Sequence, residues 1–504
     1  MDHGAQHRDA AVARRDDTET TPLLKSRAYS VCAVSSAVTR QAPDARPKQL
    51  GPSCDDCSTW CQEGIMLATC ATPLTLTCIL QYSIEMSSLV AAARLGKIEL
   101  GAASLANMSA LITCYAIFQG LAASVDAMCS QAYRSGETQL VGLYCQRMML
   151  LLLGLTVPMA ISWLLSDKVM FHLLPNAESA RLCSLHLKIS ILAIPGYAAF
   201  EVGKCFLKAK GLFTATTYAL LVGAPANAVL MWLLIWKFHL GFIGIPVSAA
   251  ITRTLLPIFL YLHVRLVDGS QCWGGFGKGA FVNLRTMIRL AVPRIAMIEA
   301  EWLAFAIMTI ISIQFGVEYL AAQSILTAMM TLSYQVPFPL SIAASSRVAF
   351  LIGSGRVKSA KVAAGVAVAV STTWTFLNFI IYIMLRGRLS GIFLDDEEVA
   401  SLVASAMPII AVSTFFDGVA VAAHALLRGV GKRSSGGKAN LIAYYTLSIP
   451  LSIGFGVGLE MRIKGLWIGC ILGLLIVSIT EYVYVFNGDW HQAVTDTEAI
   501  APNY

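Results

Sequence analysis

The chain has 504 residues, of which 56% are hydrophobic and 13% are charged, and its mean hydropathy is +0.66. Soluble domains carry about 25% charged residues, so this chain lacks the charged side chains that a soluble fold of its length would need. Its formal net charge of +7 is scattered over short polar segments, which argues against a nucleic-acid partner. We therefore expect an integral membrane protein in contact with the lipid bilayer.

Residues 1–60 form a polar segment that is rich in Asp, Arg, Ser and Thr. This composition predicts a disordered cytoplasmic tail, and no apolar run near Met1 indicates a cleavable signal peptide. Within the tail, Glu19–Leu24 fits the acidic dileucine pattern that sorting adaptors bind, with a chance match as the alternative. A functional signal would place the protein in a vacuolar or lysosomal membrane rather than in the plasma membrane.

Twelve apolar segments follow the tail. Each is long enough to cross the roughly 30 Å of hydrocarbon in a bilayer as a helix, and irregular backbone cannot face lipid. The sequence therefore predicts an all-α polytopic membrane protein with twelve transmembrane helices. The expected spans are 64–92, 104–128, 147–166, 186–206, 212–237, 242–265, 287–313, 318–342, 361–385, 402–427, 439–459 and 465–487.

The two halves of the chain repeat at a nearly constant offset. The matched places are Pro73 with Pro293, 96–104 with 316–324, 207–211 with 427–431, and Gly244 with Gly465. Each half holds six expected spans, an even number, so both halves enter the membrane in the same direction. This arrangement predicts two parallel six-helix bundles that face each other across a cleft, an architecture suited to alternating access.

The domain boundaries follow from the repeat. We expect an N-terminal bundle at 61–266, a cytoplasmic loop at 267–286, a C-terminal bundle at 287–487 and a cytoplasmic tail at 488–504. Lys and Arg are more frequent in the loops on the side of the two termini, which places both termini in the cytoplasm. Because one chain contains both bundles, we expect a monomer.

Two acidic residues lie deep in the expected spans of the second half. Glu301 is about halfway along the seventh span and Asp417 about halfway along the tenth. A carboxyl group that is desolvated at such a depth has a raised pKa and can bind and release a proton. The alternative is a neutral, hydrogen-bonded acid that only stabilises the bundle. At the repeat offset the first half has Gln81 and Tyr197 in these places, so only the second half carries the acids.

Other polar residues in the spans are weaker candidates for a functional role. Asp126 could cap a following short helix or pair with Arg147, and Glu201 could pair with Lys204 or Lys208 on its own helix face. Arg253 needs a carboxylate partner that the sequence does not identify, whereas Glu85 is expected to reach toward the outer surface. His424 is expected to make a polar contact, with a membrane acyltransferase histidine as the alternative.

Aromatic side chains and cysteines complete the candidates. Trp302 and Tyr334 are among the aromatic residues that could line a pocket for flat organic cations. Cys54, Cys57 and Cys61 have no second cysteine or histidine pair with which to hold zinc. We therefore expect no metal site and no cofactor apart from the coupling proton, and a membrane-proximal thiol is the preferred reading of this cluster.

Several segments resemble the multidrug and toxic compound extrusion (MATE) family in its eukaryotic branch. The similar segments are 124–133, which contains Gln131, then Gln146 with Arg147, Glu301 with Trp302, 344–348 with Arg347, and 428–431; Asn227 keeps a Pro-x-Asn pattern of the fifth helix. The resemblance covers roughly residues 60–487. It implies twelve helices in two bundles, with Glu301 and Asp417 taking part in proton coupling.

The resemblance also implies export of organic cations, drugs or secondary metabolites in exchange for protons, and not an enzyme. Arg134, Lys208 and Lys210 depart from the family pattern. A lipid-linked-sugar flippase of the same superfamily is one alternative, although such proteins usually have a more basic cavity. A membrane-bound acyltransferase is an alternative of a different class, and His424 is the single residue that favours it.

Overall fold

The computed structural model describes residues 60–134, 138–210, 212–266, 284–393, 396–430, 443–487 and 490. The tail with its sorting motif, Cys54 and Cys57, nearly all of the expected loop at 267–286, and most of 488–504 lie outside these residues. A few side chains within the helices also lie outside the description, among them those of Gln131 and Glu301.

The first half of the described chain consists of helices only. Its elements are α3 (Trp60–Leu95), α4 (Lys97–Ala110), η2 (Leu111–Tyr115), α5 (Ala116–Arg134), α6 (Thr138–Leu164), α7 (Ser166–Leu173), α8 (Ala177–Ser190), η3 (Ile191–Ala193), α9 (Ile194–Ala209), α10 (Phe213–Trp232), η4 (Leu233–Lys237), η5 (Gly241–Ile243) and α11 (Gly244–Leu266). The segments η2 and η4 are π-helical, whereas η3 and η5 are 3₁₀ turns.

The described second half is also helical. Its elements are α12 (Leu284–Ile313), α13 (Val317–Tyr334), α14 (Pro337–Gly353), α15 (Val357–Phe393), α16 (Glu397–Gly429), η8 (Ala443–Ser448), α18 (Ile449–Ile453), η9 (Gly454–Gly458) and α19 (Arg462–Phe486). Within the described residues, ten helical segments are long and apolar enough to cross a membrane. The helix α12 and the run from η8 to η9 occupy the places of the seventh and eleventh expected spans.

Several helices extend beyond the apolar segments that predicted them. The third begins at Thr138 instead of 147, and α14 continues to Gly353 instead of ending at 342. Polar residues lower the local hydropathy in these stretches, such as Gln146 and Arg147 of α6 and Ser346 and Arg347 of α14, while the backbone stays helical. Proline breaks three spans where its missing N–H interrupts the ladder, because Pro195, Pro337 and Pro450 each stand in the first turn of a new helix.

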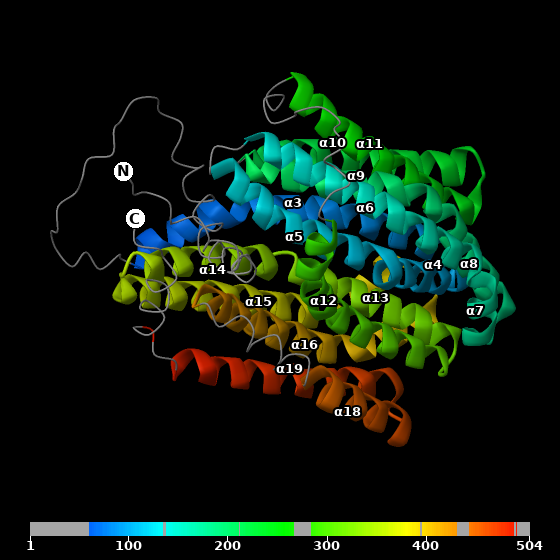
Figure 1. Ribbon diagram of the computed structural model, residues 1–504. Helices are drawn as coiled ribbons and strands as arrows, with labels where there is room; N and C mark the ends of the chain where they lie inside the picture. Colours follow the sequence, from blue (N-terminus) through cyan, green and yellow to red (C-terminus); the bar gives the residue numbers. More distant parts are fainter. Residues whose placement is uncertain are drawn as a thin grey trace, which may run out of the picture.

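The two halves form two groups of roughly parallel helices. In Figure 1, α9, α10 and α11 of the first half lie in the upper part of the molecule, and α15, α16 and α19 of the second half lie in the lower part. The beginning of α3 and the end of α19 lie at the same end, which we call the terminal end. The opposite end, where α3 ends and α16 begins, is the distal end. This arrangement agrees with an even number of membrane crossings.

The backbone repeats between the halves as the sequence predicts. Gly96 and Gly316, which match at the repeat offset, both adopt positive φ values, of 156° and 125°, between the first and second helix of each half. The π-helical segments η4 and η9 are a second matched pair. His239 and Glu460, which follow these segments, share a φ of 55°. Such uncommon conformations at matched places confirm the internal repeat.

The interface between the two halves, which we call the seam, is formed by helices from both. The helix α5 packs against α12, and α3 packs against α14 and α15 as well as against its own neighbour α10. Leu67 and Ala71 of α3 share a buried cluster with Leu340 and Ala343 of α14. The first helix therefore belongs to the first half by sequence but contacts both halves.

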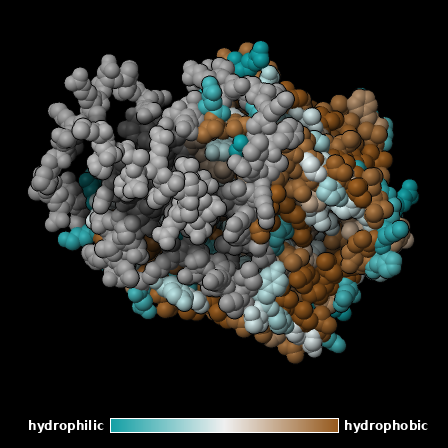
Figure 2. All heavy atoms as spheres, viewed as in Figure 1, coloured by the Kyte–Doolittle hydropathy of each residue, from teal (hydrophilic) through white to brown (hydrophobic). Residues whose placement is uncertain are grey.

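The outer surface of the described helices is largely apolar. Figure 2 shows hydrophobic residues over a broad part of the visible face, with hydrophilic residues mainly toward its edges. Large exposed side chains on α6, α10 and α15 contribute to this surface, such as Val157, Leu221 and Phe376, which are 60%, 52% and 53% exposed. A surface of this kind requires a lipid environment, so the protein is an integral multi-pass membrane protein.

Candidate functional site

Asp417 lies in the central part of α16 and is 8% exposed, although it is an ionisable residue within a membrane span. Its neighbour Gly418 allows α15 to approach closely, because a Cβ at this position would collide with Cγ2 of Thr375. Ser371 of α15 donates a hydrogen bond to the Gly418 carbonyl at 3.1 Å. The packing of α15 therefore fixes the backbone that carries the Asp417 carboxyl group.

The other predicted acid, Glu301, lies in α12, but its side chain is outside the described residues, so its shared cavity with Asp417 stays a prediction. Trp302, the next residue, is half-buried. One turn further on, the ring of Phe305 lies 6.4 Å from that of Tyr444 and 6.5 Å from that of Trp467. An aromatic cluster therefore continues from this part of α12 to η8 and α19.

In the first half, a buried arginine lies beside Tyr197, the residue that matches Asp417 in the repeat. Arg253 of α11 forms an ion pair with Glu85 of α3 and donates a hydrogen bond to the hydroxyl of Tyr115. Its guanidinium lies 4.3 Å from the ring centre of Tyr115 and 5.9 Å from that of Tyr197. Tyr197, the repeat counterpart of Asp417, is thus one of the aromatic side chains that surround Arg253.

This network answers one question from the sequence and corrects one expectation. Glu85 is the carboxylate partner of Arg253, and the expectation that Glu85 only reaches toward the surface is wrong. The two residues are 168 positions apart in the chain, so helix packing alone brings them together. The arginine side chain is 11% exposed, and burial at this level makes the pairing necessary.

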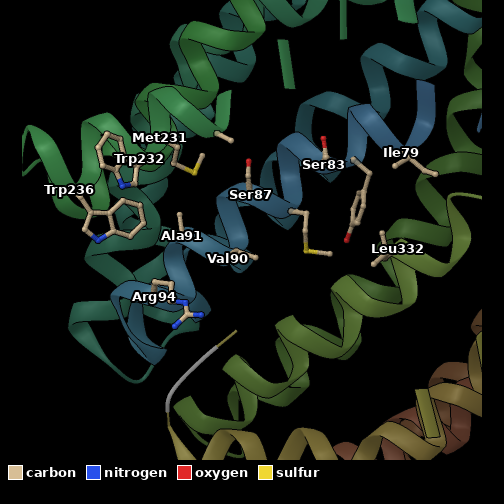
Figure 3. Close-up of a pocket in the computed structure, with 13 residues that line it drawn as sticks. Ile79, Ser83, Ser87, Val90, Ala91, Arg94, Met231, Trp232, Trp236 and Leu332 are labelled. Carbon is tan, nitrogen blue, oxygen red and sulfur yellow. The ribbon is translucent and has the colours of Figure 1, made fainter. Parts of the chain in front are cut away.

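A pocket of about 440 Å³ lies at the seam, next to this network. In Figure 3, Ser83, Ser87 and Arg94 of α3 and Trp232 with Trp236 of α10 and η4 border the pocket, and Leu332 of α13 lies across from them. The hydroxyl of Tyr82 donates a hydrogen bond to the Ala328 carbonyl at 2.8 Å. The pocket is therefore mainly apolar and aromatic, with polar groups from the first helix.

Ion pairs connect the two halves at both ends of the seam. At the terminal end, Arg347 of α14 binds Glu63 of α3 through Nε at 2.9 Å and Nη2 at 2.8 Å. At the distal end, Lys97 of α4 lies 3.0 Å from Glu318 and 3.3 Å from Asp396. Both ends of the central region are thus bridged by charged groups in this conformation.

The remaining predicted residues have structural contacts. Asp126 accepts a hydrogen bond from Lys208 at 2.6 Å, and the predicted cap is wrong because α5 continues without a break through Asp126 to Arg134. Glu201 pairs with Lys204 at 2.6 Å, as expected for one helix face. The guanidinium of Arg147 lies 5.8 Å from the centre of the Tyr144 ring.

Two further candidates have different surroundings. Asn227 is fully buried, donates to Ser87 at 2.8 Å and accepts from Thr252 at 3.0 Å, so it ties α3, α10 and α11 together. Gln81 is half-buried on α3. Tyr334 stacks on Phe338 at 5.2 Å where proline separates α13 from α14. No group of three or more metal-ligating side chains occurs among the described residues.

Sequence reasoning missed Glu63 and Glu481. Glu63 stands just before the expected first span and is 1% exposed, and Glu481 stands inside the expected twelfth span and is fully buried. The rule that found Asp417, an acid inside an apolar run, would also have found Glu481. No signal in the sequence alone connects Glu63 with Arg347, which is 284 residues away.

Two repeated halves of membrane-spanning helices, charged bridges at both ends of the seam and buried acids within the helices define a membrane transporter. The family model described as MatE matches residues 73–233 and 293–453, two segments that are related by the same offset as the repeat. The chain therefore belongs to the MATE family of transporters.

Relatives and a solved structure agree with this assignment. An uncharacterized transporter of Saccharomyces cerevisiae is 36% identical over 444 residues, which are 88% of this chain and 64% of that protein. Multidrug and toxin extrusion protein 1 of Xenopus tropicalis is 28% identical, over 87% of this chain and 77% of that protein. The crystal structure of the eukaryotic MATE transporter AtDTX14 is similar in fold, with a TM-score of 0.75 and 23% identity, over 88% of this chain and 100% of that one.

Proposed function

We propose that the chain exports small organic cations, drugs or secondary metabolites in exchange for protons, by alternating access and without a cofactor. The substrate class rests on the name of the Xenopus relative, a multidrug and toxin extrusion protein. The coupling ion rests on the acids of the second half.

The observation that carries the coupling is the burial of Asp417. A carboxyl group that is 8% exposed within an apolar helix is costly to ionise, so it binds a proton until a cation replaces it. One site that holds either a proton or a cationic solute, but not both, gives obligatory exchange. Glu301, one of the acids of α12, is proposed to share this role. The aromatic side chains of the central region are proposed to contact flat substrates.

A transport assay with three variants tests the coupling. The protein is reconstituted in liposomes, a pH gradient is imposed, and the movement of a fluorescent organic cation is followed for the wild type, Glu301→Gln and Asp417→Asn. We expect both variants to lose gradient-driven transport. Glu398→Gln is the matched control, because Glu398 is an exposed acid in the first turn of the same helix as Asp417.

The outcomes separate the readings. If Asp417→Asn and Glu301→Gln both keep pH-driven transport, the coupling assignment fails. If a sodium gradient drives the wild type and a pH gradient does not, sodium is the coupling ion. Movement of a lipid-linked sugar in place of the cation would overturn the exporter proposal.

We further propose that the transporter works as a monomer, because one chain contains both halves of the repeat. For the choice of membrane, we propose that Glu19–Leu24 directs it to a vacuolar or lysosomal membrane. Fluorescence microscopy of a tagged chain tests the signal, since changing Leu23 and Leu24 to Ala should move the protein to the plasma membrane. An unchanged distribution would show that the motif is not used.

A further inference from the structure

A second buried acid lies in the C-terminal half, close to the terminal end. Glu481 of α19 is fully buried, and its Oε2 lies 2.5 Å from Nδ1 of His424 on α16. Among the described residues, neither carboxylate oxygen of Glu481 has a hydrogen bond of suitable geometry. The imidazole is 28% exposed, so one side of the pair is buried and the other is accessible.

The fold itself does not require an acid at this position. At the offset that relates η4 to η9, the place of Glu481 is taken in the first half by Leu260. Leu260 is 2% exposed and packs on the neighbouring helix beside Gly203. A leucine therefore fills the equivalent space, whereas a buried carboxylate is unfavourable unless it is paired. A residue that costs stability in one half only indicates a function specific to that half.

We propose that Glu481 and His424 form a proton-binding site distinct from Asp417, in which the buried carboxylate orients the imidazole and His424 takes up a proton during the transport cycle. Because Nδ1 is the ring nitrogen in contact with Glu481, the added proton is bound at Nε2, on the opposite edge of the ring. The nearby carboxylate stabilises the imidazolium that results. Proton release breaks the Nε2–H bond and leaves a neutral imidazole whose Nδ1 still lies next to the Glu481 carboxylate.

The groups around the pair allow it to change its charge. Arg428, one turn beyond His424 on α16, acts electrostatically on Glu481, as does Tyr482 on α19. Arg428 also interacts with Tyr334 of α13 and donates to Ser341 of α14 at 2.7 Å. Glu481 therefore keeps a cationic neighbour, Arg428, when His424 is neutral.

The site is coupled to the proposed proton site through α16. Asp417 and His424 are seven residues apart, so they lie on the same face of the helix and about 10 Å apart along its axis. This role rests on the proposed proton exchange. In that cycle Asp417 exchanges its proton for the substrate cation. The contact with Glu481 sets the pH at which His424 becomes positively charged, close to the terminal end of α16 and α19.

The pH dependence of transport tests the site, with exchange of a fluorescent organic cation measured in liposomes at equal pH on both sides, from about pH 5 to 8, the range in which histidine titrates. We expect Glu481→Gln to move the midpoint of the curve of exchange rate against pH to lower pH by about one to three units, because the imidazolium loses its counter-ion. His424→Gln should abolish the change in exchange rate that is centred on this midpoint. Tyr484→Phe is the control on the same helix, because Tyr484 is 51% exposed, and it should keep the wild-type midpoint.

A second measurement separates this inference from the proposed function. Titration of isotope-labelled His424 by nuclear magnetic resonance in lipid nanodiscs should show the same downward shift in Glu481→Gln, whatever the transport assay shows. An equal His424 midpoint in the wild type and in Glu481→Gln overturns the inference, even if proton-driven transport is intact. A wild type that ignores pH gradients overturns the proposed function, while the His424 titration still decides this site.

Discussion

At the scale of single residues, Gly418 determines how the buried acid of the second half is held. The contact of its backbone with Thr375 leaves no room for a side chain between α15 and α16. We expect Gly418→Ala to separate the two helices next to Asp417 and to lower stability by about 1–3 kcal/mol, the usual cost of overpacking. The thermal unfolding midpoint of the purified protein in detergent measures this effect.

A second substitution at the same contact should restore the lost stability. Thr375→Ser removes the Cγ2 methyl group that an alanine at position 418 would strike, and it keeps the hydroxyl that donates to the Ser371 carbonyl at 3.1 Å. The double variant should therefore recover most of the lost stability. Gly154→Ala is the control, because no atom lies within 4 Å of a Cβ at that position of α6. A Gly418→Ala protein as stable as the wild type would contradict this reading of the packing.

The scale of secondary-structure elements shows the repeat most directly. Asn176 accepts hydrogen bonds from the backbone of Glu178 and Ser179 at the start of α8. Asp396, at the matched place of the second half, accepts from Glu398 at 3.0 Å and Val399 at 3.2 Å at the start of α16. Only the second of these caps is ionised, and it also contacts Lys97 of the first half. The cap therefore begins a helix and bridges the seam.

The ionised cap makes the start of α16 sensitive to acid. Hydrogen bonds from the Val399 amide, then the contact with Lys97, hold the pKa of Asp396 below its usual range. Since the folded value lies below the unfolded value of about 3.9, the stabilisation is complete above that pH and is lost as the pH falls through the folded value. Asp396→Asn should therefore lose less stability on acidification than the wild type.

Thermal unfolding in detergent between about pH 3 and 6 checks this sign, since the range brackets the titration of an aspartate. Asp396→Ala should also lower stability near neutral pH, by about 0.5–2 kcal/mol, because it removes the cap itself. Asp396→Asn, which keeps a capping oxygen, should lose less there. Equal acid sensitivity of the wild type and Asp396→Asn would rule out this source of pH dependence.

The same elements show how far sequence reasoning reaches. Local signals predicted the repeat, since Gly96 and Gly316 stand where the backbone needs a positive φ. Hydropathy located Asp417 inside a span, and the structure finds it buried. The ion pair between Glu85 and Arg253 could not be predicted, because the two residues lie on different helices. Hydropathy indicates the depth of a residue in the membrane but not the direction of its side chain. The cap, one of the two roles considered for Asp126, was wrong, and its partner Lys208 likewise comes from another helix.

On the scale of the whole molecule, the seam carries one charged bridge at each end. The Arg347–Glu63 pair at the terminal end is bidentate, and Glu63 is 1% exposed. The pairs of Lys97 at the distal end are each about one-third exposed, so solvent screens them more strongly. The terminal end is therefore held by the stronger bridge, and the alternating access that we propose would require this bridge to open.

Removing one partner of the buried pair should open the terminal end. Arg347→Ala leaves the Glu63 carboxylate buried without its cation, which destabilises the closed seam by about 3–5 kcal/mol. In an open seam, water solvates the carboxylate and this cost disappears. Spin labels at the exposed positions Gln139 of α6 and Lys358 of α15 report the separation of the halves at this end. Pulsed electron paramagnetic resonance should show a longer distance in Arg347→Ala than in the wild type.

The neutral double variant, Glu63→Gln with Arg347→Gln, is the matched control for charge. It removes both ions together, so the closed distance should return in part even though the ion pair is gone. Labels at Glu178 of α8 and Glu398 of α16, both exposed at the distal end, should show no lengthening in Arg347→Ala, because the Lys97 bridge is intact there. Lengthening at both ends would indicate general loss of packing, and an unchanged distance at the terminal end would show that the pair does not hold the seam.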